Sequence, residues 1–389
     1  MKEAYKQLVL GMLCLFIVMA IGRFAYTPIM PFMQLNTSMD NPSAGMLATY
    51  NYLGYLIGAI IPIWIIVFNK VVDLKIYLMI NIISTLFMGI FDSYILWAIF
   101  RFVSGVSSGT VFVLASNVAL EALKMVRIER ISGLLYSGVG LGIFSSSIFI
   151  FLFTSVNTWK TTWVLLGIFS LIMAIFIIFG MRENDRTDHE SHKTNESQSN
   201  VSSKLKKKFI WGFSIAYFCE GAGYIITGTF LVAIVKSIPS LSDYAALSWM
   251  FVGLGAIPST ILWSMLADML GHGKATYLAF ILQIISVTLP ILSESMLSLI
   301  LSSLLFGSTF LGLTTLFMSK AQALMYQNNS KLNLVAILTV IYSLGQMIAP
   351  ALSGLLIGSA GNFNAALIFA AAILCVGLFS SMYSYRTRY

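Results

Sequence analysis

Long apolar runs separated by short polar stretches dominate the chain. Twelve such runs cover residues 7–33, 44–68, 75–91, 94–118, 131–153, 161–181, 209–235, 244–267, 275–292, 296–319, 332–358 and 364–384. A helix needs about 20 apolar residues to cross the hydrocarbon core of a bilayer. The pattern therefore predicts an all-α integral membrane protein with twelve transmembrane helices, numbered here as spans 1 to 12 in chain order.

One long hydrophilic stretch interrupts this pattern. Residues 182–208 are rich in Ser, Asn, Asp, Glu, His and Lys and contain almost no apolar side chains. Such a composition predicts a solvated, flexible linker. It divides the chain into an N-terminal half of six spans (residues 1–181) and a C-terminal half of six spans (residues 209–389), with a cytoplasmic linker between them (residues 182–208).

The two halves share sequence features. Residues 136–140 in span 5, Tyr-Ser-Gly-Val-Gly, resemble residues 342–346 in span 11, Tyr-Ser-Leu-Gly-Gln. Gly105 in span 4 and Gly307 in span 10 fall at matching positions. Two six-helix halves related by an axis along the membrane normal are typical of transporters. We therefore expect two pseudo-symmetric bundles, and transport in preference to a receptor or an anchor.

The overall composition excludes several other classes of protein. The chain is 58% hydrophobic and 10% charged, with a mean hydropathy of +0.88, whereas soluble domains carry about 25% charged residues. The sequence contains no Walker motif, no cluster of metal ligands and no nucleophile–base constellation. Its three cysteines lie inside apolar runs without metal-like spacing. We expect no cofactor, no metal and no enzymatic activity.

The basic residues predict how the chain is oriented. With a cytoplasmic N-terminus, 19 of the 23 Lys and Arg residues fall in inside segments, two in outside segments and two within spans. Cytoplasmic loops carry such an excess. This distribution predicts a multi-pass protein of the cell membrane with both termini in the cytoplasm. It also accounts for the net charge of +8 without a nucleic-acid partner. The residue usage is typical of bacteria.

Three ionisable residues lie well inside spans: Arg23, Arg101 and Glu220. The helical rise places them roughly 22, 20 and 16 Å above the inner surface, in one layer. Burying a charge in lipid costs at least about 2.5–3.5 kcal/mol. In one interpretation the arginines bind an anionic substrate, and Glu220 carries the coupling proton together with Arg101. In the other, Glu220 and an arginine form a structural ion pair.

Uncharged side chains near this layer extend the candidate site. Tyr26, Asn51, Tyr224 and Gln346 offer hydrogen bonds without a charge penalty. We therefore expect Arg23, Arg101 and these four residues to bind substrate. Glycines crowd span 5, and because glycine allows close helix contact, Gly138 and Gly142 are candidates for a gating interface.

The loop between spans 8 and 9 resembles the loop signature of the major facilitator superfamily. Residues 264–274 read Ser-Met-Leu-Ala-Asp-Met-Leu-Gly-His-Gly-Lys. The resemblance implies the superfamily fold, a gate held by Asp268, Gly271 and Lys274, and proton coupling for Arg101 of span 4. The equivalent loop of the first half, residues 69–75, is degraded.

A narrower resemblance comes from Gly-Arg-Phe-Ala-Tyr-Thr-Pro at residues 22–28, Asn-Tyr-Leu-Gly-Tyr-Leu at 51–56 and Glu-Gly-Ala-Gly-Tyr at 220–224. These segments resemble the YbfB/YjiJ branch of the superfamily, some of whose relatives are thought to export opine-type metallophores. The branch itself implies little about substrate. Together with the buried charges, it leads us to predict a monomeric, proton-coupled exporter of a small anionic or zwitterionic metabolite, with an opine-type metallophore as one candidate cargo. A multidrug or sugar exporter and a non-transporting membrane sensor or scaffold are the alternatives.

Overall fold

The computed structural model describes residues 1–128, 131–154, 158–183, 207–328, 334–358 and 361–387. Within these residues the chain is helical and contains no strand. In chain order the helices are α1 (Lys2–Leu15), η1 (Phe16–Phe24), α2 (Tyr26–Asn36), α3 (Asn41–Trp64), α4 (Lys70–Ile90), α5 (Tyr94–Met125), α6 (Leu134–Thr154), α7 (Trp159–Gly180), α8 (Lys207–Lys236), η3 (Ser242–Tyr244), α9 (Ala245–Leu270), α10 (His272–Leu292), α11 (Met296–Asn328), α12 (Leu334–Ile357) and α13 (Phe363–Thr387).

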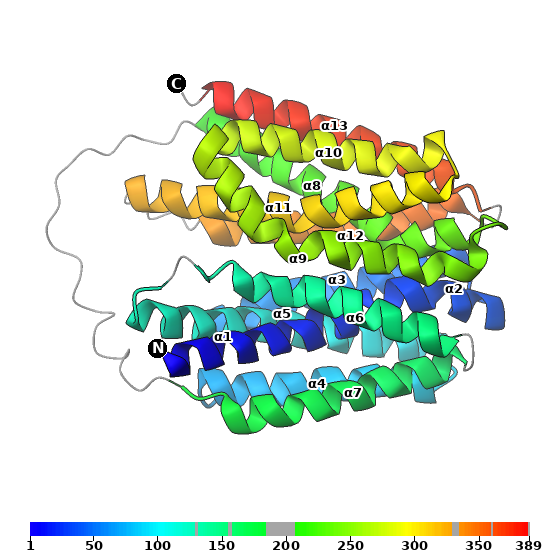
Figure 1. Cartoon of the computed structure of the whole chain (residues 1–389), viewed down its shortest axis with the longest axis horizontal. Coiled ribbons are helices and arrows are strands. Elements are labelled where there is room, and N and C mark those ends of the chain that lie inside the picture. Colours follow the sequence, from blue (N-terminus) through cyan, green and yellow to red (C-terminus); the bar gives the residue numbers. More distant parts are fainter. Residues whose placement is uncertain (129–130, 155–157, 184–206, 329–333, 359–360, 388–389) are drawn as a thin grey trace, which may run out of the picture.

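Twelve of the described segments are long and apolar enough to cross a membrane, which confirms the predicted number of spans. The first of them, Lys2–Asn36, joins α1, η1 and α2 end to end. The chain begins at the same end of the bundle at which α13 finishes (Figure 1). We call this the termini end and the opposite one the far end.

The helices form two groups, α1–α7 and α8–α13, which lie side by side (Figure 1). Matching glycines bring helices together in each group. A Cβ on Gly105 of α5 would lie 2.9 Å from the carbonyl carbon of Asn51 in α3. A Cβ on Gly307 of α11 would lie 2.8 Å from the carbonyl carbon of Val252 in α9. The spans 2 and 4 of the first half therefore pack like spans 8 and 10 of the second.

The largest contacts between the halves are α3 with α12 and α6 with α9, and α2 also packs against α8. Near the far end, Asn41 donates to the carbonyl of Gly358, and Thr49 donates to the carbonyl of Met347, each at 2.9 Å. Nearer the termini end, Thr260 of α9 donates to the carbonyl of Gly133 at 2.9 Å. These bonds seat side chains of one half directly on the backbone of the other.

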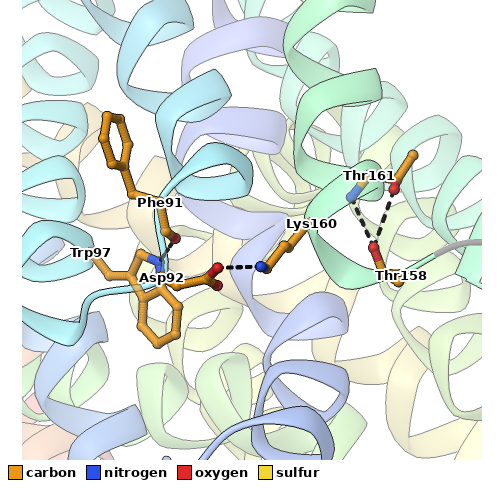
Figure 2. Close-up of polar contacts among 6 residues, drawn as sticks. All are labelled: Phe91, Asp92, Trp97, Thr158, Lys160 and Thr161. Atoms are coloured by element: carbon orange, nitrogen blue, oxygen red, sulfur yellow. Dashed lines mark hydrogen bonds and ion pairs between the residues drawn. The ribbon is translucent and has the colours of Figure 1, made fainter.

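Tight hairpins close the far end of the first half. Lys160, at the start of α7, forms an ion pair with Asp92, which lies between α4 and α5 (Figure 2). Trp97 donates its indole N–H to the carbonyl of Phe91 at 2.8 Å and meets Trp159 edge-on at 5.3 Å. Tryptophans at the ends of spans are typical of the membrane–water boundary.

The second span ends earlier than the sequence predicts, because α3 stops at Trp64 rather than at residue 68. Asp73, at the start of α4, accepts hydrogen bonds from the backbone N–H groups of Val67 (2.7 Å) and Phe68 (3.2 Å). A carboxylate that binds these N–H groups holds them out of the helical register. The predicted linker lies almost entirely in residues 184–206, outside the described residues.

Candidate functional site

A π-helix interrupts the first span. Nine residues, Phe16–Phe24, wind with the wider π turn between α1 and α2. A π turn pairs each carbonyl with the N–H five residues ahead. For Arg23 that residue is Pro28, which has no N–H. Pro28 lies in the first turn of α2, so the backbone at the junction of η1 and α2 lacks one N–H donor. Such segments are rare and often mark functional sites.

Helix α5 supplies the missing hydrogen-bond donors. Arg101 donates to the carbonyl of Gly22 at 3.1 Å and to that of Arg23 at 3.3 Å. Ser104 donates to Gly22 and Ser108 to Val18, each at 2.9 Å. Because these donors face the backbone of η1 and its carbonyls, α5 holds the first span in the π form. Arg101 is predicted from sequence to bind substrate, but the structure places it in this contact.

Tyr26 and Asn51 belong to the same network. The guanidinium carbon of Arg101 lies 4.6 Å from the ring centre of Tyr26, whose hydroxyl donates to the carbonyl of Ala44 at 2.9 Å. Asn51 donates its side-chain amide to the carbonyl of Arg101 at 2.8 Å. Three of the predicted substrate-binding residues thus connect α2, α3 and α5, and their free polar atoms are Nε of Arg101 and Oδ1 of Asn51.

Arg23 itself projects into an aromatic surrounding. Its guanidinium carbon lies 4.3 Å from the ring centre of Tyr55, 4.7 Å from Tyr52 and 5.1 Å from Phe24. Only 2% of the residue is exposed. Its Nε and Nη2 atoms have no hydrogen-bond partner. These two atoms form one edge of the guanidinium, which matches the two oxygens of a carboxylate.

Glu220 lies across from Arg23, on α8 of the second half. It is fully buried, and neither of its carboxyl oxygens has a hydrogen-bond partner. Tyr217 and Tyr224 lie one turn away on the same face of α8. Tyr342 of α12 stacks on both rings, at 4.5 Å from Tyr217 and 6.0 Å from Tyr224.

Tyr224 and Tyr342 lie within electrostatic range of both Arg23 and Glu220. Gln346 donates its side-chain amide to the hydroxyl of Tyr224, which keeps two predicted residues together. Among the described residues Glu220 forms no ion pair with an arginine, so this conformation does not contain the structural pair of the alternative interpretation. The predicted layer therefore contains two buried charges that face one aromatic core and remain unpaired.

The predicted gating glycines lie inside the first half rather than between the halves. A Cβ on Gly138 would meet the backbone of Met12 in α1 at 2.9 Å, and one on Gly142 would meet Phe16 of η1 at 3.1 Å. Gly140, between them, faces the other half, with Ile257 of α9 at 2.6 Å. The contact between halves thus passes through Gly140.

The loop residues Asp268, Gly271 and Lys274 lie at the exposed termini end, where α9 meets α10. Gly271 has a φ of +84°, which favours glycine at this turn. Among the residues that the structure describes, Asp268 and Lys274 make no hydrogen bond or ion pair. By contrast Asp73, in the degraded first copy, is 4% exposed and binds two backbone N–H groups. Their roles in gating stay a prediction.

Comparison with known proteins agrees with this architecture. A family model described as "Uncharacterised MFS-type transporter YbfB" matches residues 15–381. The chain belongs to this family. No curated protein matches it, so the family places the chain among the transporters of the major facilitator superfamily and gives no substrate.

Solved structures share the fold of this YbfB-type transporter. A variant of the nucleoside transporter NupG superposes with a TM-score of 0.74 at 13% identity, over 98% of this chain and 100% of that one. A bacterial homologue of the human lysosomal transporter Spinster, inward-facing and unoccupied, gives a TM-score of 0.66 at 14% identity, over 100% of this chain and 98% of that one. At such low identity these likenesses show the fold alone.

Several residues of the YbfB-type site escape sequence reasoning. Tyr55, Tyr342 and Phe310 join the aromatic core but carry no charge to draw attention to them. One signal was available for Tyr55, which follows Tyr52 by three residues and so shares its helix face. The π-helix had a weaker signal in Gly22 and Pro28, which predict an irregular helix without fixing its form.

Proposed function

We propose that the chain is a proton-coupled secondary transporter that moves a small anionic or zwitterionic metabolite by alternating access. One observation carries this proposal: Arg23 and Glu220 are buried and unpaired on opposite halves, with Tyr224 and Tyr342 near both. Unpaired charges inside a membrane protein are costly and are typical of substrate or proton sites. The free edge of Arg23 is suited to the anion and the carboxyl of Glu220 to the proton.

Alternating access follows from where these charges lie. Arg23 is 2% exposed and Glu220 is fully buried, so neither is open to cargo in this conformation. The two groups of helices meet through α3–α12 and α6–α9, and rocking of one group against the other would expose the site to either end in turn. We assign the direction as export in exchange for protons, which rests on the relatives of the branch and not on geometry.

The aromatic core suggests a second candidate function. Tyr224 stacks parallel to Phe310 with ring centres 5.6 Å apart, and Phe310 stacks on Phe306 at the same distance. Aromatic surfaces bind uncharged rings as well as charged ones. An exporter of sugars or of multiple drugs would use these rings and would not depend on Arg23.

Reconstitution in proteoliposomes separates these candidates. We expect a pH gradient to drive flux of carboxylated metabolites through the wild-type protein and not through Glu220→Gln, whereas cargo exchange without a gradient survives in the variant. Glu294→Gln, the same change at an exposed loop position, is the matched control and keeps both activities.

Each outcome of this experiment has a defined meaning. Equal gradient-driven flux through wild type and Glu220→Gln would remove the coupling role from Glu220. Transport of neutral sugars or drugs that survives Arg23→Gln would favour the second candidate. Absence of flux for every compound, with binding intact, would support the sensor or scaffold alternative.

A further inference from the structure

Three aromatic rings pack around the guanidinium of Arg23, and one edge of the guanidinium has no hydrogen-bond partner. Tyr52 and Tyr55 of α3 lie 4.7 and 4.3 Å from the guanidinium carbon, and Phe24 lies 5.1 Å away. The Nε and Nη2 atoms are unpartnered at the open edge. A carboxylate bound there by two hydrogen bonds lies in the plane of the guanidinium.

The opposite half presents a second aromatic surface. The ring plane of Tyr224 is within 17° of that of Phe310 and within 13° of that of Tyr342. Phe24 connects the two surfaces, with its ring edge-on to Phe310 at 6.2 Å. Aromatic rings therefore continue from the surroundings of Arg23 to those of Glu220, and the rings of the second half are nearly parallel to one another.

We propose that the cargo is an aromatic carboxylate, a flat ring that carries its anionic group in or near the ring plane. This inference rests on the proposed function and narrows its substrate class. A carboxylate on the free edge of Arg23 places a directly attached ring in the extended guanidinium plane. Tyr52, Tyr55 and Phe24, which pack around the guanidinium, are then the aromatic residues nearest to the cargo ring. Aromatic pairs gain stability beyond the area they bury.

The residues around Arg23 and Tyr224 also disfavour aliphatic acids and polyols as cargo. An aliphatic acid gains from burial against these rings but has no ring quadrupole of its own. A polyol needs many hydrogen-bond partners, whereas the hydroxyl of Tyr224 already accepts from Gln346, and that of Tyr342 is hydrogen-bonded with Thr314 at 3.3 Å. A ring with one carboxylate uses the unpaired edge of Arg23 and leaves these hydroxyl contacts intact.

Binding of matched acids to the purified full-length protein in lipid nanodiscs tests the proposal. The probes are benzoate against cyclohexanecarboxylate and 2-naphthoate against its fully saturated analogue, with 2-naphthylmethanol as the ring without a charge. Isothermal titration calorimetry measures binding without the leak that weak acids cause across vesicles. We expect each aromatic acid to bind about two- to twelvefold more tightly than its saturated partner, and the alcohol to bind more weakly than 2-naphthoate.

Three variants assign the preference to residues. Tyr55→Leu reduces the ratio between aromatic and saturated acids, whereas Tyr55→Phe, which keeps the ring, preserves it. Arg23→Gln weakens all the acids and leaves the alcohol unchanged. The conservative Tyr55→Phe keeps the test valid even if Tyr55→Leu fails to fold.

The result that overturns the inference differs from the one that overturns the proposed function. Equal binding of aromatic and saturated acids, lost in Arg23→Gln, would end the ring requirement and leave the anion site standing. Binding of 2-naphthylmethanol as tight as that of 2-naphthoate would show a ring site without an anion site. If neither member of any pair binds, the aromatic carboxylate is wrong, and the Glu220→Gln flux experiment still decides proton coupling with other cargo.

Discussion

The guanidinium of Arg101 donates to the carbonyl oxygen of Arg23, at 3.3 Å. One buried arginine thus holds the backbone from which another projects its side chain. The bond lies at the junction of η1 and α2, where Pro28 lacks an N–H that could serve the backbone. On the proposed function the two arginines have different roles: Arg101 positions the backbone of η1, and Arg23 binds the cargo with its unpartnered edge.

Arg101→Lys should weaken cargo binding although residue 101 does not contact the cargo on the proposed function. Lysine keeps the charge but cannot donate to two carbonyls in the fixed fork of a guanidinium. We expect KM for transport to rise more than kcat falls, and the free energy of unfolding to drop by about 1.5–3 kcal/mol, the contribution of a hydrogen bond to a charged group. Flux kinetics and thermal unfolding in detergent measure the two effects.

Two further variants serve as comparisons for Arg101→Lys. Ser104→Ala removes one neutral donor to Gly22 and should cost about 0.5–1.5 kcal/mol, with a smaller rise in KM. Arg182→Lys, an exposed arginine, should change neither quantity. An Arg101→Lys protein with wild-type KM and stability would show that the π segment holds without this clamp.

Larger side chains at Gly105 or Gly307 should destabilise both halves alike. A Cβ at these positions meets the backbone carbonyl group of Asn51 or Val252, and backbone cannot move aside as a flexible side chain can. Overpacking of this kind typically costs about 1–3 kcal/mol, so Gly105→Ala and Gly307→Ala should each lower the unfolding temperature. Gly133→Ala, whose Cβ would meet side-chain atoms no nearer than 3.7 Å, is the control. If one alanine were harmless, the two halves would not be packed alike.

The elements most fully predicted from the sequence are those that depend on long patterns. Twelve apolar runs give twelve spans. Backbone polar groups in lipid must hydrogen-bond within their own segment, and a helix satisfies all of them. The equivalence of Gly105 and Gly307 is likewise visible, since close helix contacts require small residues. Ends of helices are less predictable: α3 stops at Trp64 because Asp73 reaches back to Val67 and Phe68.

Within the site, charge marks the right residues but not their tasks. Arg23, Arg101 and Glu220 stand out because charge is costly in a membrane. The direction in which each side chain points depends on tertiary contacts that the sequence does not display. Tyr26 and Asn51 turn to the carbonyls of Ala44 and Arg101, whereas the uncharged rings of Tyr55 and Tyr342 surround the unpaired groups.

Thr49→Ala should favour opening of the far end. Thr49 donates to the carbonyl of Met347 across the two halves, and loss of a bond worth about 0.5–1.5 kcal/mol raises the open population about two- to twelvefold. Electron–electron distances between spin labels at Asn36 and Ser293, both exposed at the far end, report this shift. Thr37→Ala removes a bond to Met33 within the first half and should leave the distances as they are. Identical distributions for both variants would show that the Thr49 bond does not hold the halves together.

Asp40, which caps α3 outside the membrane, should make the stability of the protein depend on pH in the acidic range. Its carboxylate accepts a hydrogen bond from the N–H of Ser43 at 2.9 Å, and hydrogen bonding to Ser43 lowers the pKa of Asp40 below its ordinary value. A lowered pKa in the folded protein adds stability above the unfolded pKa of about 3.9, and that stability is lost as the pH falls through the lower folded value.

Asp40→Ala should therefore cost about 0.5–1 kcal/mol at neutral pH, near the low end for N-caps because the site is exposed and screened by solvent. The cost should vanish once the pH falls below the lowered pKa of the folded carboxyl, where the wild-type side chain is protonated too. Asp40→Asn caps the helix without a charge, so its stability should follow pH less steeply than that of the wild type in this range. Thermal unfolding in detergent between neutral and acidic pH measures all three proteins. A difference between wild type and Asp40→Ala that persisted unchanged into acid would mean that the cap does not depend on the ionised carboxylate.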